Sequence, residues 1–216
     1  MEEILALGPQ YEVLVVDDNS PDGTWRIVGE MAEREPRVHL LRRLAERGRG
    51  SAGVAGLREA AGQGADLVVE MDADFSHHPR FIPALVQAAQ DADVVVGSRL
   101  VEGGGEAGRS FLRTLITRFA NLYIRLVLRL PVRDCTSGFR VFRREALMKM
   151  GLEKMTSNGP AIVQEIFLGA RRAGARFVEV PILFEERRAG QSTFNCRVLL
   201  AGFLAVLKFR FQRPRS

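Results

Sequence analysis

The sequence predicts an α/β fold with a mainly parallel sheet that is covered by helices on both faces. Three observations lead to this prediction. Short apolar runs alternate with longer helical segments through the first half of the chain. Acidic or polar residues directly follow several of these runs, as they do where strands end. With 216 residues, of which 46% are hydrophobic, the chain is long enough for one sizeable domain.

The predicted elements follow one another in a β-α rhythm. Strands are expected over residues 11–16, 38–41, 66–71 and 92–96. Helices are expected over residues 24–35, 51–61 and 79–90. The first of these helices follows a turn at residues 20–23, and the last has Pro79 in its first turn, where a missing N–H is harmless. Ligands of such sheets bind at the carboxyl ends of the strands, so residues 17–18, 72–74 and 97–99 are candidate site residues.

The second half of the chain has a different character. Three glycines at 103–105 indicate a flexible loop, and residues 111–130 form an apolar segment with arginines at 113, 118, 125 and 129. The spacing places Arg118, Arg125 and Arg129 on one helix face. Residues 198–215 repeat the pattern, with basic residues after an apolar stretch. Each segment is either an amphipathic helix on a membrane surface or a packed helix with a solvated basic face.

Charge and cysteine content limit the function classes. The net charge is +5, and nearly all basic residues are arginines, which suit phosphate or an anionic surface but can also reflect base composition. Cys135 and Cys196 are far apart in the sequence, so we expect neither a disulfide framework nor a structural zinc site. We therefore expect the protein to reside in a reducing compartment. No signal peptide opens the sequence, and the apolar run at 198–207 is too short to span a membrane.

The acidic pair in MDADFSHHP, residues 71–79, is the strongest chemical signal. In an extended segment, Asp72 and Asp74 would point to the same side, about 7 Å apart along the chain. Two carboxylates at a strand end suit Mg²⁺ or Mn²⁺ with open positions for phosphate. His77 and His78 would face opposite ways, so we expect them to serve in the turn or in packing. A solvated turn is the alternative for the whole stretch.

Residues 48–53 match the pattern G-x-G-x-x-G. A dinucleotide-binding loop should follow its strand directly, but residues 42–47 intervene. We therefore expect a glycine-rich helix start. The alternative function, an NAD-dependent oxidoreductase, has no support in the sequence other than this match. The polar loops at 134–140 and 186–192 identify no reaction by their spacing.

Together these motifs resemble a known family. DDNSPDGT at 17–24, MDADFSHHP at 71–79, GSR at 97–99, DCTSGFR at 134–140 and the stretch at 187–192 occur in the order seen in dolichol-phosphate (polyprenol-phosphate) mannosyltransferases. These are inverting family 2 glycosyltransferases with a GT-A fold. The resemblance runs from about residue 2 to about residue 205. It implies a catalytic domain over residues 1–193, and we expect residues 194–216 to form a basic amphipathic helix that contacts a membrane.

The resemblance also implies a reaction and its residues. Mannose would pass from GDP-mannose to dolichyl or polyprenyl phosphate, with Mg²⁺ or Mn²⁺ as cofactor. The implied catalytic residues are Asp74, Arg99 and Arg113. The implied metal ligands are Asp72, Asp74 and Ser76. The implied substrate-binding residues are Val16, Asp18, Asp72, Ala73, Arg118, Glu165, Arg187 and Ser192. Among these, Asp18 would contact the base or ribose, Glu165 would lie near the sugar, and Arg187 would contact a phosphate.

The chemistry agrees with an arginine-rich chain. A lipid monophosphate has a second pKa near 6, so it is anionic at neutral pH and needs no general base. The enzyme must instead hold two anionic substrates together with a metal ion and arginines. A lipid acceptor gives both basic segments a purpose, so we expect peripheral binding at the cytoplasmic face of a membrane. We expect no nucleic-acid partner.

Two departures from the family pattern leave alternatives open. The family begins with a strand and a Pro-x-Tyr-Asn-Glu-type loop, whereas residues 1–5 resemble the end of the helix that follows them. The first β-α unit is therefore expected to be missing, which would leave a free sheet edge beside residues 11–16. Thr193 stands where the family commonly has lysine. The alternatives are a glucosyltransferase that uses UDP-glucose on the same acceptor, and a catalytically impaired homologue that acts as a binding or accessory subunit.

Overall fold

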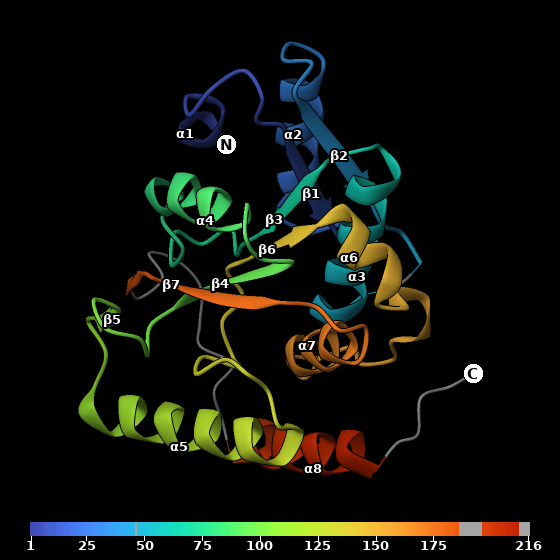
Figure 1. Ribbon diagram of the computed structural model, residues 1–216. Helices are drawn as coiled ribbons and strands as arrows, with labels where there is room; N and C mark the ends of the chain where they lie inside the picture. The colour runs from blue at the N-terminus through green and yellow to red at the C-terminus, as the bar shows by residue number, and fades with distance from the viewer. Residues whose placement is uncertain (46, 186–195, 212–216) are drawn as a thin grey trace.

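The computed structural model describes residues 1–45, 47–185 and 196–211 (Figure 1). The strands are β1 Val13–Asp17, β2 Val38–Arg42, β3 Leu67–Glu70, β4 Val94–Ser98, β5 Gly105–Ala107, β6 Arg140–Arg143, β7 Phe177–Pro181 and β8 Leu183–Glu185. The α-helices are α1 Glu2–Leu5, α2 Thr24–Ala32, α3 Arg49–Gly62, α4 Ile82–Ala88, α5 Phe111–Leu128, α6 Arg144–Lys149, α7 Ile162–Arg172 and α8 Cys196–Phe211. Short 3₁₀ turns occur at η1 Pro79–Phe81 and η2 Leu152–Lys154.

The first half of the chain forms the predicted elements in the predicted order. All four expected strands and all three expected helices are present, and the third helix begins as the 3₁₀ turn η1 before α4. Strands β1 and β2 pair in parallel, as do β4 and β7. The α/β prediction is confirmed.

The main sheet differs from the prediction in one strand. Its order is β3-β6-β4-β7, and β6 runs antiparallel to both of its neighbours. Strands β3 and β4 follow each other along the chain, but β6, which was not predicted from the sequence, lies between them in the sheet. Its sequence, RVFR, does not look like the interior of a sheet because it begins and ends with arginine. Arg140 is nevertheless completely buried, because its guanidinium forms an ion pair with Glu70 on β3.

The sheet is interrupted beside β1. Among the described residues, β1 hydrogen-bonds only to β2, and β3 hydrogen-bonds only to β6. The expected free edge beside residues 11–16 is therefore present. Helix α3 packs across both strands: Gly56 lies against Val16 of β1, and Gly53 lies against Glu70 of β3. The helix joins two parts of the sheet that share no strand hydrogen bonds within the described chain.

The largest hydrophobic core lies among the main sheet and helices α3, α5, α6 and α7. Phe142, Ile166 and Phe167 are among its fully buried side chains. Helix α8 lies alongside α5 at one side of the molecule (Figure 1). Val206 and Phe209 of α8 belong to this same core. Helix α8, which follows the expected boundary at residue 193, thus shares its hydrophobic core with the elements before that boundary.

The start of α3 is packed tightly against a distant loop. A Cβ atom on Gly50 would lie 2.0 Å from the carbonyl oxygen of Ser157. The Gly50 N–H donates to the carbonyl oxygen of Asn158 at 3.0 Å. Glycine is therefore required at position 50 so that two backbone segments can approach each other.

Substitution of Gly50 by alanine should destabilise the protein. The added methyl group meets backbone atoms that cannot rotate away, so we expect a loss of about 1–3 kcal/mol in the free energy of unfolding. Gly62→Ala is the matched control, because it lies in the same helix and its Cβ would meet nothing within 4 Å. That control should gain up to about 1 kcal/mol. Urea denaturation of both variants measures the difference, and equal midpoints would contradict the proposed tight contact.

Candidate active site

The carboxyl ends of β1 and β3 are connected by the glycine-rich start of α3. The Gly48 N–H donates to Asp18 Oδ2 at 2.8 Å, and Arg43 lies 3.1 Å from the other carboxylate oxygen of Asp18. Gly48 has a φ of +135°, a conformation that favours glycine. The G-x-G-x-x-G stretch is thus the predicted helix start, and it also fixes Asp18, which the resemblance places at the nucleoside.

Arg49, the next residue, reaches the acidic stretch. Its guanidinium Nη2 lies 2.7 Å from Asp72 Oδ1. Burial alone would favour the neutral acid, but the positive charge of Arg49 lowers the pKa of Asp72 below its ordinary value. A Cβ on Gly138 would lie 2.7 Å from the same guanidinium nitrogen. The polar loop at 134–140 therefore contributes a wall of the site, although its spacing had identified no chemistry.

The acidic stretch bends instead of continuing β3. The strand ends at Glu70, residues 73–77 form a bend, and Phe75 has a φ of +62°. The extended geometry from which we argued that Asp72 and Asp74 point to the same side is therefore wrong. The N–H and hydroxyl of Ser76 both donate to Asp74 Oδ1. Ser76 is buried and orients the carboxylate of Asp74. Direct metal ligation by Ser76 stays a prediction.

The two histidines have the packing and turn roles that the sequence predicted. His77 is buried and stacks on Phe139, with 5.1 Å between ring centroids. Its Nδ1 accepts the backbone N–H of Asp72 at 3.2 Å, and burial lowers its pKa to about 4, so it is neutral at neutral pH. His78 accepts the backbone N–H of Arg80 at the start of η1. His77 thus stabilises the bend by packing on Phe139 and by accepting the N–H of Asp72.

Arg99 follows β4 and is held by protein carboxylates. Its Nε and Nη2 each lie 2.7 Å from an oxygen of Asp134, and its Nη1 lies 3.3 Å from Glu106. Burial alone would lower the pKa of Arg99, but the carboxylates of Asp134 and Glu106 raise it above its ordinary value. Two carboxylates and the hydroxyl of Thr136 therefore surround this guanidinium. Its predicted catalytic role stays a prediction.

The other predicted residues are dispersed around this centre. Val16 is a partly buried residue of β1, and Ala73 lies in the bend. Arg113 lies in the first turn of α5, which Ser110 caps, and Arg118 is exposed farther along that helix. Arg187 and Ser192 lie outside the described residues.

Glu165 braces the loop that packs against α3. Its carboxylate accepts the backbone N–H groups of Thr156 at 3.1 Å and Ser157 at 2.9 Å. The adjacent Asn158 carbonyl accepts from Gly50, next to Arg49. Glu165 is therefore connected to the ion pair of Arg49 with Asp72 through the loop at residues 156–158 and the backbone of Gly50. In the structure Glu165 supports this loop, and contact with a sugar stays a prediction.

The acidic stretch fits a hard divalent cation in its donor chemistry. Asp72 and Asp74 offer carboxylate oxygens, and the side chain of Asp72 is 38% exposed. No group of three or more His, Cys, Asp or Glu residues suited to a metal ion occurs in the part of the chain that the structure describes. Mg²⁺ commonly takes one or two protein carboxylates and completes its shell with water and substrate phosphate. The fit is therefore to an ion that binds together with a phosphorylated ligand.

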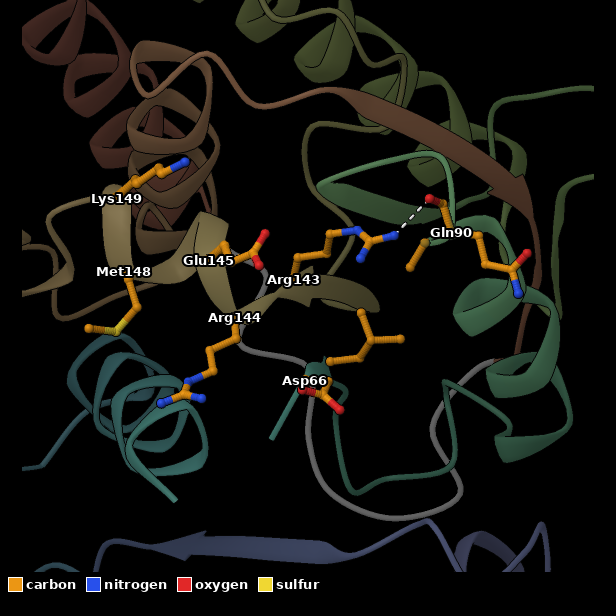
Figure 2. Close-up of a pocket in the computed structure, with 9 residues that line it drawn as sticks. Asp66, Gln90, Arg143, Arg144, Glu145, Met148 and Lys149 are labelled. Carbon is orange, nitrogen blue, oxygen red and sulfur yellow. Dashed lines mark hydrogen bonds between the residues drawn. The ribbon is translucent and has the colours of Figure 1, made fainter. Parts of the chain in front are cut away.

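A hollow away from these residues lies at the other end of the strands. Figure 2 shows this hollow of about 730 Å³, with Asp66, Gln90 and Arg143 among its lining residues. Arg143 donates to the carbonyl oxygens of Gln90 at 2.7 Å and Ala92 at 3.1 Å, so backbone groups already occupy its guanidinium. Asp66 precedes β3, whereas Asp72 follows it. The hollow is therefore separate from the strand-end carboxylates.

A neutral replacement of Glu165 separates a positioning role from sugar contact. Glu165→Gln should weaken the two charge-assisted hydrogen bonds and so increase amide hydrogen exchange at Gly50 by about ten-fold. Glu59→Gln, an exposed change on α3, is the control. Exchange at Gly50 that matches the parent, together with a higher KM for donor, would instead support direct sugar contact.

Comparison with known proteins places this geometry in a family. The profile of glycosyl transferase family 2 matches residues 1–151. The chain is 41% identical over 187 residues to an undecaprenyl-phosphate mannosyltransferase of Micrococcus luteus, covering 87% of this chain and 77% of that protein. It is 40% identical over 189 residues to a polyprenol monophosphomannose synthase of Mycolicibacterium smegmatis, covering 87% and 71%.

A solved structure shares the fold at lower sequence identity. Glucosyl-3-phosphoglycerate synthase from Mycobacterium tuberculosis, in complex with Mn²⁺, UDP-glucose and glycerol 3-phosphate, aligns with a TM-score of 0.63 and 21% identity. The alignment covers 100% of this chain and 75% of that one. The strand-end acidic site and these matches together show that the chain belongs to glycosyl transferase family 2 and is a glycosyltransferase with a GT-A fold.

Proposed function

We propose that this glycosyltransferase transfers mannose from GDP-mannose to a polyprenyl or dolichyl phosphate and yields polyprenyl-phosphate mannose. The observation that carries the proposal is the identity of about two-fifths, over 87% of the chain, to two enzymes whose names specify mannosyl transfer to such lipids. The acidic bend after β3 and the fixed Asp18 after β1 support it, because a nucleotide sugar needs both a nucleoside site and a diphosphate site.

The donor would lie across the two strand ends. Asp18, held by Gly48 and Arg43, would receive the base or ribose. Asp72 and Asp74 would hold Mg²⁺ or Mn²⁺, with the diphosphate beside Arg49. When bound, the divalent ion supplies positive charge that makes GDP a better leaving group. Ser76 and His77 keep the carboxylates in place by their hydrogen bonds to Asp74 and to the backbone of Asp72.

The acceptor needs positioning more than activation. An oxygen of the anionic lipid phosphate would form a bond to the anomeric carbon while the bond from that carbon to GDP breaks, with inversion of configuration. No proton has to be removed from the attacking oxygen. Arg113 and Arg118 on α5 would offset the repulsion between acceptor and donor phosphates. Arg99 would contribute if phosphate replaces one of its carboxylate partners.

Helices α5 and α8 suit a membrane surface, where a lipid acceptor resides. They lie side by side (Figure 1), and Tyr123 stacks on Phe203 with 4.1 Å between ring centroids. Their outer faces expose large apolar side chains, whereas their inner faces join the core. The exposed set is Phe111, Leu112, Leu115, Phe119, Leu122 and Leu126 on α5, and Phe203, Leu204 and Phe211 on α8. We name this set the apolar platform.

Basic residues border the platform. Arg118 and Arg125 are exposed on α5, and Lys208 and Arg210 are exposed near the end of α8. Contiguous apolar surface bordered by cations suits an interface with anionic lipid, where apolar side chains enter the acyl boundary. No helix among the described residues is both long and apolar enough to cross a bilayer. On the strength of the platform and its basic border, we propose peripheral binding at the cytoplasmic face of a membrane, with residues 194–216 as part of the contact.

Transfer of radiolabelled sugar tests the reaction and its donor. With Mg²⁺ or Mn²⁺ and a polyprenyl phosphate, GDP-mannose should donate and UDP-glucose should not. Asp74→Ala should lower kcat by about 100-fold or more, because a charge-stabilising group at the diphosphate is lost. Asp91→Ala, an exposed carboxylate elsewhere, is the control.

Each other outcome has a distinct meaning for the proposal. Transfer from UDP-glucose in place of GDP-mannose would assign the glucosyltransferase alternative. Binding of GDP without transfer from either donor would favour a non-catalytic homologue. Full activity of the Asp74→Ala variant would contradict the role of the acidic bend.

The apolar platform makes a separate prediction about membranes. The double variant Phe119→Ser/Leu126→Ser should bind phosphatidylglycerol vesicles at least about ten-fold more weakly, because two large side chains no longer leave water. Both residues are exposed, so folding should be unaffected. Met148→Ser, an exposed apolar residue on α6, is the control. Vesicle co-sedimentation that is equal for all three proteins would exclude the platform as the membrane contact.

A further inference from the structure

We propose that Arg49 binds the donor diphosphate and holds Asp72 until donor and metal ion arrive. The inference rests on the proposed use of a nucleotide sugar, but it concerns a residue that the sequence motifs did not assign. In this scheme the guanidinium exchanges partners. It pairs with Asp72 when the site holds no donor, and it pairs with the diphosphate when Asp72 turns to the metal ion.

The backbone on either side of Arg49 is fixed. Gly48 donates its N–H to Asp18, and Gly50 donates its N–H to Asn158. Arg49 is also the first residue of the 14-residue helix α3. Its side chain therefore extends from a fixed point between the end of β1 and the end of β3. This is the place where a donor bound to Asp18 at its nucleoside would have its phosphates.

The guanidinium occupies a defined slot that solvent still reaches. Asp72 lies on one side at 2.7 Å, and the missing side chain of Gly138 leaves room on another. A Cβ at position 138 would also come within 3.4 Å of Asp72 Oδ2 and of His77 Cε1. The side chain of Arg49 remains 41% exposed. A ligand can thus reach the guanidinium without unfolding of the surrounding loops.

The local charges make this exchange favourable. Glu70, Asp72 and Asp74 all attract Arg49, and Glu70 is already neutralised by Arg140. A divalent ion at Asp72 would compete with the guanidinium for the same carboxylate and would be repelled by it. A diphosphate relieves this conflict, because its oxygens offer the guanidinium a new anionic partner with matching geometry. Metal and diphosphate should therefore bind together more strongly than either binds alone.

Direct binding measurements test the exchange without any sugar transfer. Arg49→Leu should bind Mn²⁺ alone about ten-fold more tightly, as measured by the electron paramagnetic resonance signal of free Mn²⁺. The same variant should bind GDP and inorganic pyrophosphate about ten-fold more weakly in the presence of Mg²⁺, as measured by calorimetry. Weaker binding of both GDP and pyrophosphate by Arg49→Leu would locate the contact of Arg49 at the diphosphate, since pyrophosphate has no base or ribose.

Two further variants complete the test. Arg58→Leu removes the same charge from an exposed position on α3, and it should leave both affinities within about two-fold of the parent. Arg49→Lys keeps the charge but loses the planar fork, so it should retain weak Mn²⁺ binding and only part of the pyrophosphate affinity. Circular dichroism establishes that each variant is folded.

The outcomes separate this inference from the proposed function. Unchanged Mn²⁺ and pyrophosphate affinities in Arg49→Leu would overturn the inference even if the parent transfers mannose. The predicted changes in both affinities would support it even if no lipid acceptor is glycosylated. Weaker GDP binding with unchanged pyrophosphate binding would also overturn it, because the contact would then lie at the nucleoside.

Discussion

The ion pair between the buried Arg140 and the partly buried Glu70 is the interaction on which the centre of the molecule depends. The two residues are register partners on β6 and β3, and Arg140 is completely buried. Its guanidinium lies 5.3 Å from the ring centroids of both Phe142 and Phe167. Removal of one partner from a buried pair leaves an uncompensated charge and typically costs about 3–5 kcal/mol. The pair therefore fixes β3 at the residue from which the acidic stretch departs.

From this fixed strand end, the candidate site is assembled by loops that are distant in sequence. Asp72 receives Arg49 from the start of α3, and the space for that guanidinium comes from Gly138. Glu165 holds the loop that contacts Gly50. The geometry of the acidic stretch is thus a product of tertiary contacts, since the stretch itself contains neither a helix nor a strand. The two carboxylates accordingly have separate partners: Arg49 contacts Asp72, and Ser76 donates to Asp74.

Local patterns in the sequence were sufficient for the elements of the first half and for the position of the acidic residues at strand ends. Apolar runs such as Val13–Asp17 gave strands, and the acidic residues after them lie at strand ends as predicted. Strand β6 was missed because its first residue is a buried arginine, whose partner Glu70 is 70 positions away. Arg49 was not singled out, because the glycine pattern was interpreted as a helix start and not as a cofactor loop, and its partner Asp72 is 23 positions away. The Arg99–Asp134 pair spans 35 positions, so no local pattern could reveal it.

The interruption beside β1 has a consequence for how the two halves of the site are connected. Strands β1 and β2 and helix α2 form a unit in which the strands pair with each other in parallel and α2 connects them along the chain. Among the described residues, α3 and side-chain packing connect this unit to the main sheet, without strand hydrogen bonds. The half of the site that carries Asp18 is therefore linked to the half that carries Asp72 through α3, and a donor bound across both halves would bridge a gap that no strand hydrogen bond spans among the described residues.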